Sequence, residues 1–432
     1  MQKETLNTTE TLWTKILFIS LFAYLFLLIF PHTQTLKEIA FWTAFLCWVV
    51  LRLRKSEPFI ALNPVVITLS IFMVIAFISS ITGMEPIKEN ISRFKGELLT
   101  PFILFLIAST EFNNIEKARQ LLSALLVAFA INTILAIAES LNYGLSYFWD
   151  RTHRDQYLWL INYSQMGAII FPLILGIFLI IKNKWLKYLL ITFASIVFAI
   201  LSAYTRVTVF LSIISVLLLW VMFSRPKKYR FWTIAFVSLF LFVFGLFLYA
   251  HKDNITIVEY GSKLEKIVNI PGEFKSEEGF SNRMPAWIAA IDIIKEKPLL
   301  GYGWGMKKFI EVVRQEKFLE KWKAEKPYVY EFYTVFKNVF FPPHNLFLEV
   351  ALQSGLLGLG AFMIFLGIYL FYLIKNVTHN GSDTEYNFSI ILIGGTLLSF
   401  IIMSLMSNEL GNISGKILFA VLGLGVARVK NA

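Results

Sequence analysis

A histidine stands where an apolar helix is expected to begin, at His344 in the stretch PPHNLFLEVALQSGLLGLGAF, residues 342–362. An imidazole titrates near neutral pH, so it can gain or lose a proton under physiological conditions. At 100° per residue, Ala351, Gly355 and Gly358 lie within about 40° of the azimuth of His344. Small residues on one face allow a neighbouring helix to approach closely. The pattern predicts a histidine at the end of a tightly packed helix, with Gly355 and Gly358 in structural roles.

Arg206 is the single charged residue in the apolar stretch 188–224. One helix over this stretch would be about 55 Å long, whereas the hydrocarbon core of a bilayer is about 30 Å thick. The stretch is therefore expected to form a hairpin with Arg206 at its tip, near the outer edge of the hydrocarbon. A snorkelling interfacial anchor is one interpretation. The isolation of the arginine at a tight hairpin favours the other, a site for an anionic ligand.

Arg283 lies between Ser281 and Pro285, which are typical of a helix cap and a first helical turn. A cation near a helix N-terminus opposes the helix dipole, at a cost on the order of 0.3–1 kcal/mol. An anion such as phosphate, bound by the free N–H groups and the guanidinium together, would remove this conflict. An exposed arginine whose cost is tolerated explains the residue equally well.

Two further basic groups are weaker candidates for anion binding. Arg151 and Arg154 precede the apolar run that starts at 159, and they lie one turn apart if that segment is helical. Neighbouring aspartates can pair with them. Arg93 and Lys95, before the apolar run at 98–109, carry a still weaker signal.

The composition indicates the class of protein that must position these residues. The chain has 432 residues, of which 57% are hydrophobic and 16% charged, against roughly 45–50% and about 25% in soluble domains. An all-α polytopic membrane protein is therefore expected. About twelve transmembrane helices are predicted, at 16–30, 39–51, 64–82, 98–109, 120–139, 159–181, 188–205, 207–224, 232–250, 345–374, 388–406 and 417–428. The single cysteine, Cys47, excludes a disulfide within the chain.

Lysine and arginine placement predicts the orientation of the chain. With twelve spans, the basic clusters at 52–55, 182–187, 225–230 and 428–430 all fall on one side. The positive-inside rule makes that side cytoplasmic and places both termini there. The sequence pI of about 9.4 mostly reflects this topology. Nucleic acid is a poor partner for the chain because the basic residues are divided among short loops.

This topology divides the chain into residues 1–250 with nine spans, an external loop at 251–343, and residues 344–432 with three spans. The loop has the composition of a soluble domain. Within it, Val312, Leu319 and Trp322 can share one face of an amphipathic helix, with basic residues around them. We expect that helix to lie on the lipid surface rather than to act in catalysis.

The chain resembles the O-antigen ligase family, whose superfamily includes the O-antigen polymerases. The motif His344-Asn345, nine residues, then Gly355-x-x-Gly358 is the sharpest match, and it follows the large external loop. LSAYTRVTVFLS around Arg206 and SNRMPAW…PLLGYGWG around Arg283 support it. Sequences of the superfamily often carry an acidic residue shortly before the first glycine. This chain has Gln353 there, so no carboxylate is expected at that position.

The resemblance implies a glycosyltransferase of lipopolysaccharide biosynthesis. It would move O-antigen glycan from undecaprenyl pyrophosphate to a sugar hydroxyl of lipid A–core, on the periplasmic side of the bacterial inner membrane. His344 would be the general base, and Arg206, Arg283, Arg151 and Arg154 would bind the pyrophosphate. A direct displacement would invert the anomeric centre.

Asn345 would hydrogen-bond to a sugar or orient the histidine ring. The sequence contains no Asp-x-Asp pair of the kind that suggests a divalent metal. A mechanism without a metal or another cofactor is therefore expected, with arginines in place of the cation.

Two other functions compete with the ligase. An O-antigen polymerase would use the same donor and a second lipid-linked glycan as acceptor, and the motifs barely separate the two. The large loop before the tenth span favours the ligase. A transporter of lipid-linked glycans is expected to show paired discontinuous helices or buried ion pairs. The gathering of the charges at the outer surface disfavours that function.

Overall fold

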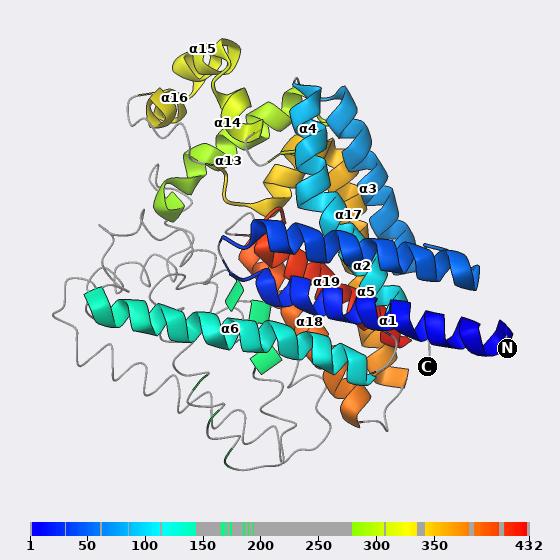
Figure 1. The fold of residues 1–432 in the computed structure, drawn as a ribbon. Helices are drawn as coiled ribbons and strands as arrows, with labels where there is room; N and C mark the ends of the chain where they lie inside the picture. The colour runs from blue at the N-terminus through cyan, green and yellow to red at the C-terminus, as the bar shows by residue number, and fades with distance from the viewer. Residues whose placement is uncertain are drawn as a thin grey trace.

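The computed structural model describes residues 2–30, 32–60, 63–84, 86–112, 115–143, 279–305, 308–334, 342–379, 384–405 and 410–429, with isolated positions between 166 and 193. The regular elements in these ranges are all helices (Figure 1). Arg151, Arg154 and Arg206 lie outside the described residues, as do most of the spans predicted between 159 and 250.

The helices in the N-terminal part of the described chain overlap with the spans predicted between residues 16 and 139. They are α1 (Gln2–Leu27), α2 (Gln34–Lys55), α3 (Pro64–Thr82), α4 (Ile87–Phe94), the π-helical segment η1 (Lys95–Leu99), α5 (Thr100–Glu111) and α6 (Ile115–Tyr143). The predicted span at 98–109 is the C-terminal part of a longer helical run formed by α4, η1 and α5. A π-helical segment inside such a run widens one turn locally.

The C-terminal part contains α17 (Leu346–His379), α18 (Thr384–Ser404) and α19 (Ile413–Val429). Within the described residues, two segments are long and apolar enough to cross a membrane, Pro64–Thr82 and Leu346–Lys375. Shorter apolar stretches occur in α1, α6, α18 and α19. The structure therefore confirms an all-α architecture in its described part, and the count of twelve spans remains a prediction.

Helix α3 is the central partner of α17. Asn63 begins α3 by accepting a hydrogen bond from the Val65 backbone N–H at 2.9 Å, the usual role of an N-cap side chain. The Asn63 amide also donates to the Tyr372 hydroxyl on α17 at 3.1 Å. Further along, Phe72 of α3 and Phe362 of α17 pack with ring centroids 5.1 Å apart. The two helices are thus held together along their length.

Four helices of the predicted external loop gather at one end of α3 and α17 (Figure 1). They are α13 (Gly279–Glu296), α14 (Lys308–Val313), α15 (Glu316–Glu325) and α16 (Pro327–Thr334), and we call them the loop subdomain. They share a core of their own. Inside it, the buried Asp292 accepts hydrogen bonds from the Trp322 indole N–H at 3.1 Å and from Lys326 at 2.5 Å.

This core corrects the expectation that an amphipathic helix of the loop lies on lipid. Val312 and Trp322 are both fully buried, and they pack among Phe318, Val329 and Tyr333. Val312 lies in α14 and Trp322 in α15, so this stretch forms two helices rather than the single one expected, and the apolar faces of both point into the loop subdomain. A helix whose apolar face is already covered has little apolar surface left to insert into a bilayer.

Candidate functional site

Helix α17 is interrupted at Gly355, so the expectation of an unbroken helix with a continuous stripe of small residues is wrong. The backbone there has φ 69° and ψ −176°, a combination that is essentially restricted to glycine. The break frees backbone N–H groups, and the Leu356 N–H donates to the Pro298 carbonyl at 2.6 Å. A Cβ at Gly355 would lie 2.0 Å from the Leu299 carbonyl oxygen. The glycine is thus required by a crossing segment of backbone.

The carbonyl groups freed by the same break are also satisfied by the crossing segment. The Tyr302 N–H donates to the Leu352 carbonyl at 2.9 Å, and the Gly303 N–H to the Gln353 carbonyl at 3.0 Å. The Ser79 hydroxyl of α3 reaches the Gln353 carbonyl at 2.5 Å. Because both sides of the break are paired, the chain around residues 298–303 forms a rigid connection between the loop subdomain and α17.

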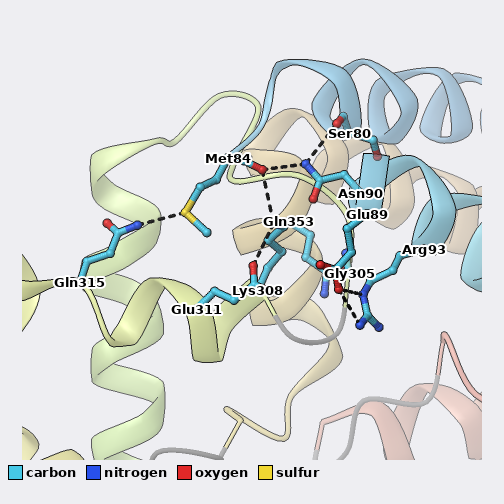
Figure 2. Close-up of polar contacts among 10 residues, drawn as sticks. All are labelled: Ser80, Met84, Glu89, Asn90, Arg93, Gly305, Lys308, Glu311, Gln315 and Gln353. Atoms are coloured by element: carbon cyan, nitrogen blue, oxygen red, sulfur yellow. Dashed lines mark hydrogen bonds and ion pairs between the residues drawn. The ribbon is translucent and has the colours of Figure 1, made fainter. Parts of the chain in front are cut away.

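The corner between α3 and α4 holds the loop subdomain from the other side (Figure 2). The Asn90 amide donates to the carbonyls of Ser80 at 3.2 Å and Met84 at 2.8 Å. The buried Lys308 donates to the same Met84 carbonyl at 3.3 Å and to Glu311 at 2.9 Å. These contacts join α14 to the end of α3, so the loop subdomain is fastened to the helical bundle at two places.

Arg93, one of the weaker candidates for anion binding, is part of this fastening. Its guanidinium donates to Glu89 at 2.9 and 3.0 Å and lies 3.5 Å from Glu97 (Figure 2 shows the Glu89 pair). Glu97 also accepts a hydrogen bond from the Trp304 indole at 3.1 Å. The positive charge of Arg93 is thus largely compensated by the two glutamates, which leaves Arg93 poorly suited to bind a phosphate.

Beside the break, several polar side chains gather with Leu346, Val350 and Gly411 against the first turns of α17. The polar side chains are those of Glu97, Trp304, Glu349 and Gln353. The Gln353 amide interacts with Glu349 at 3.4 Å and accepts from the Gly305 N–H at 3.3 Å. Gln353 thus lies next to the buried carboxylate of Glu349, four residues earlier on α17.

Asn345 begins α17 as an N-cap residue. Its side-chain oxygen accepts from the backbone N–H groups of Phe347 at 3.0 Å and Leu348 at 3.1 Å, which satisfies donors that a helix start otherwise leaves open. Its amide nitrogen donates to the Leu405 carbonyl, just after α18, at 3.2 Å. The oxygen and the nitrogen of the Asn345 side chain are therefore both hydrogen-bonded to backbone atoms of the protein. The sugar contact predicted for Asn345 stays a prediction.

His344 lies directly before this cap, half-buried, with a φ of 47°. Few residues other than glycine adopt a positive φ, although histidine is one of those enriched there. The strained backbone turns the chain between the Pro342-Pro343 pair and α17. Outliers of this kind occur frequently at functional sites, where the surrounding structure holds them.

The structure brings Arg283 and His344 together, although they are far apart in the sequence. Burial and the nearby positive charge of Arg283 lower the pKa of His344 from 6.5 to about 4. Burial also lowers the pKa of Arg283, but a guanidinium remains charged at any physiological pH. The site therefore combines a neutral imidazole with a partly desolvated cation. A bound anion would be stabilised beside that cation.

The helix that carries Arg283 begins earlier than its sequence suggested. Helix α13 starts at Gly279, so the expectation that Ser281 is its N-cap is wrong. Pro285 lies inside the helix rather than in its first turn. Arg283 is still near the N-terminal end of α13, where a cation opposes the helix dipole.

Trp287 is a residue of the site that the sequence analysis missed. Its indole N–H donates to the Pro343 carbonyl at 2.7 Å, next to His344. Trp287 follows Arg283 by four residues, and residues at this spacing share one face of a helix. That spacing is the signal that could have revealed it.

Within the described residues, two apolar segments are long enough to cross a membrane, and a helical subdomain is fastened at one end of α17, an arrangement consistent with a helical membrane protein. Residues 191–363 match the sequence profile of the family described as O-antigen ligase. The match includes Arg206, Arg283 and the whole motif from His344 to Gly358, and it confirms the resemblance. The match supports membership of the chain in the O-antigen ligase family. No curated protein matches the chain.

The family match supports a role in lipopolysaccharide biosynthesis for a membrane protein similar to glycosyltransferases. The family indicates lipid-linked glycans and lipid A–core as the general class of substrates. Of the predicted site residues, the structure places Arg283, His344 and Asn345 close to one another along α13 and the start of α17, and Gly355 and Gly358 further along the same helix.

Proposed function

We propose that this protein transfers O-antigen glycan from undecaprenyl pyrophosphate to a sugar hydroxyl of lipid A–core, at the periplasmic face of the bacterial inner membrane. The observation that carries the proposal is the pairing of a neutral, half-buried His344 with the cation of Arg283. A base and an anion-binding group side by side suit a reaction that removes a proton and releases a diphosphate.

In the proposed reaction, a ring nitrogen of His344 takes the proton of the acceptor hydroxyl. The acceptor oxygen attacks the anomeric carbon of the donor, and the bond from that carbon to the pyrophosphate oxygen breaks. Undecaprenyl pyrophosphate leaves with the bonding electron pair, and the configuration at the anomeric carbon is inverted. Arg283 stabilises the charge that grows on the pyrophosphate. Arg206, Arg154 and Arg151 contribute to the same anion site, and no metal takes part.

The low pKa of His344 has a consequence for the timing of this step. A base whose pKa is about 4 is neutral at pH 7 and ready to accept a proton, but it is a weak base. A pyrophosphate bound at Arg283 offsets the positive charge that disfavours the imidazolium. Donor binding therefore raises the pKa of His344 toward its ordinary value, and the base becomes stronger once the donor is in place.

The topology proposed for this function keeps twelve spans, with both termini in the cytoplasm and residues 251–343 in the periplasm. The packing of Val312 and Trp322 inside the loop subdomain supports a folded periplasmic unit that carries Arg283. Asn345 acts in this proposal through the cap that ends the His344 turn, with any sugar contact secondary.

The test is the transfer rate of purified His344→Ala with undecaprenyl-pyrophosphate glycan and lipid A–core. General-base catalysis contributes on the order of 10²–10⁴-fold, so the single-turnover rate should fall by that factor while donor affinity stays within about twofold. His379→Ala, at the opposite end of α17, is the matched control and should transfer normally. A normal rate in His344→Ala, or a loss of donor affinity alone, would refute the base assignment.

The same assay separates ligase from polymerase. Lipid A–core and a second lipid-linked glycan are offered as acceptors in parallel reactions. Product formed with lipid A–core supports the proposal. Product formed exclusively with the lipid-linked glycan would assign the chain to the polymerases.

A further inference from the structure

Trp287 connects α13 to the segment that carries His344. Its indole N–H donates to the Pro343 carbonyl at 2.7 Å, and Arg283 lies one helical turn earlier on the same helix. We infer that Trp287 is a positioning residue, which holds the backbone of His344 so that the imidazole stays beside Arg283. This inference rests on the proposed function, because it assigns Trp287 a role through His344.

The physical link is the peptide plane between Pro343 and His344. The Pro343 carbonyl and the His344 nitrogen belong to one rigid planar unit. A hydrogen bond that fixes the direction of this carbonyl therefore restricts ψ of Pro343 and limits the rotation about the next bond, which is φ of His344. That φ is 47°, a value that needs support from the surroundings.

The other side of His344 is held independently. Asn345 caps α17 and is tied to the Leu405 carbonyl, and Pro342-Pro343 restricts the approach from upstream. The Pro343 carbonyl is the backbone atom of the turn to which Trp287 of α13 donates. Without the Trp287 hydrogen bond, the peptide plane before His344 can rotate, and the imidazole is free to move away from Arg283.

A purely structural role makes a different prediction. Trp322, in the same loop subdomain, also donates one indole hydrogen bond, to Asp292 at 3.1 Å, and it is completely buried. Its replacement by Phe should disturb the fold at least as much as the same change at the half-buried Trp287. The indole hydrogen bond of Trp322 goes to Asp292 and not to the turn before α17, so Trp322→Phe is a matched control for loss of an indole donor.

The experiment compares Trp287→Phe and Trp322→Phe in single-turnover transfer, with donor affinity measured separately. We expect Trp287→Phe to slow transfer about tenfold or more, since a misplacement of about 1 Å can cost on the order of 100-fold. Donor affinity should stay within about twofold, because Arg283 keeps its helix. Trp322→Phe should transfer within about twofold of the natural protein. If Trp287→Phe does not fold, benzothienylalanine at position 287 keeps the indole shape without the N–H.

The pH dependence of kcat/KM gives a second readout, which reports the pKa of the free enzyme. With the pKa of His344 lowered to about 4 by burial and by Arg283 on α13, the imidazole is neutral from pH 7 to pH 5, so the profile is flat there. In Trp287→Phe the imidazole moves away from Arg283, which removes one of the two causes of its low pKa. The pKa therefore rises, and kcat/KM should begin to fall at a higher pH, within the range where the natural profile is flat. Trp322→Phe should keep the flat profile.

An unchanged rate in Trp287→Phe would overturn the inference. A loss shared equally by both variants, a flat profile for Trp287→Phe, or a loss confined to donor affinity would also overturn it, because each indicates a general structural or binding effect. Failure of the proposed function is recognised separately, by normal turnover in His344→Ala.

Discussion

The break in α17 can be tested by adding a single methyl group at Gly355. The replacement Gly355→Ala places a Cβ 2.0 Å from the Leu299 carbonyl oxygen and 2.5 Å from the Leu300 nitrogen. These are backbone atoms, so no side chain can rotate to make room. The Ala residue would also have to adopt φ 69° and ψ −176°, where residues with a Cβ are strained.

The cost can be worked from these two effects. Backbone strain in this region costs about 1–3 kcal/mol. Moving the crossing segment to admit the Cβ would weaken the hydrogen bonds from Leu356 N–H to Pro298 and from Leu357 N–H to Leu299, each worth about 0.5–1.5 kcal/mol. We therefore expect Gly355→Ala to lower the free energy of unfolding by about 2–6 kcal/mol. At this chain length the melting temperature falls by roughly 1 °C per kcal/mol.

The assay uses the one cysteine of the chain. Cys47 is buried in α2, so a thiol-reactive dye reports unfolding of the detergent-purified protein during a temperature ramp. Gly360→Ala is the matched control on the same helix, because a Cβ at Gly360 meets no atom of a neighbouring element within 4 Å among the described residues. An alanine there should be neutral or stabilise α17 by up to about 1 kcal/mol, since glycine is the poorer helix former.

Gly355→Ala should therefore lower the melting temperature, whereas Gly360→Ala should leave it unchanged or raise it. Equal behaviour of Gly355→Ala and Gly360→Ala would refute the reasoning, because it would mean that α17 accepts a side chain at residue 355 and that the crossing segment does not require the break.

Two further predictions concern the arginines and the topology. Arg206→Lys and Arg283→Lys keep the charge but lose the bidentate fork that matches a phosphate. Both variants should insert normally and lose most transfer activity together with donor affinity. Near-normal transfer by either variant would show that a point charge is sufficient there. Cysteines introduced at Lys275 and Lys317, in a Cys47→Ser background, should react with a membrane-impermeant thiol reagent in cells with a permeabilised outer membrane. Labelling that requires lysis of the inner membrane would reverse the orientation and remove the periplasmic site.

Several features were predictable from the sequence because they depend on short-range chemistry. The bounds of α3 agree with the predicted span at 64–82, since Asn63 and Pro64 are strong start signals and Gly83 follows its end. The all-α class follows from the recurrence of long apolar runs, in which helices satisfy their own backbone groups. The family was recognised from His344-Asn345 and the glycines at fixed spacing, and the match over residues 191–363 confirms it.

The same spacing predicted the wrong structural role for Gly355. Helical periodicity assumes continuous φ and ψ, and it placed Gly355 in a stripe for a neighbouring helix. What occupies that space is the backbone of residues 298–303, a contact between segments that no local pattern encodes. The face of Trp322 is a similar case, because amphipathicity shows that a face will be covered but not whether lipid or protein covers it.

The sequence by itself thus determined the helical class, the bounds of α3 and the candidate residues, because hydrogen-bonding periodicity, caps and composition act within a few residues. Only the tertiary structure decided that α13 lies against the start of α17, that Trp287 reaches the Pro343 carbonyl, and that the charge of Arg283 acts on His344. These relations depend on which distant surfaces meet when the chain folds, and the free energy of that packing is shared by the whole molecule rather than contained in any one segment.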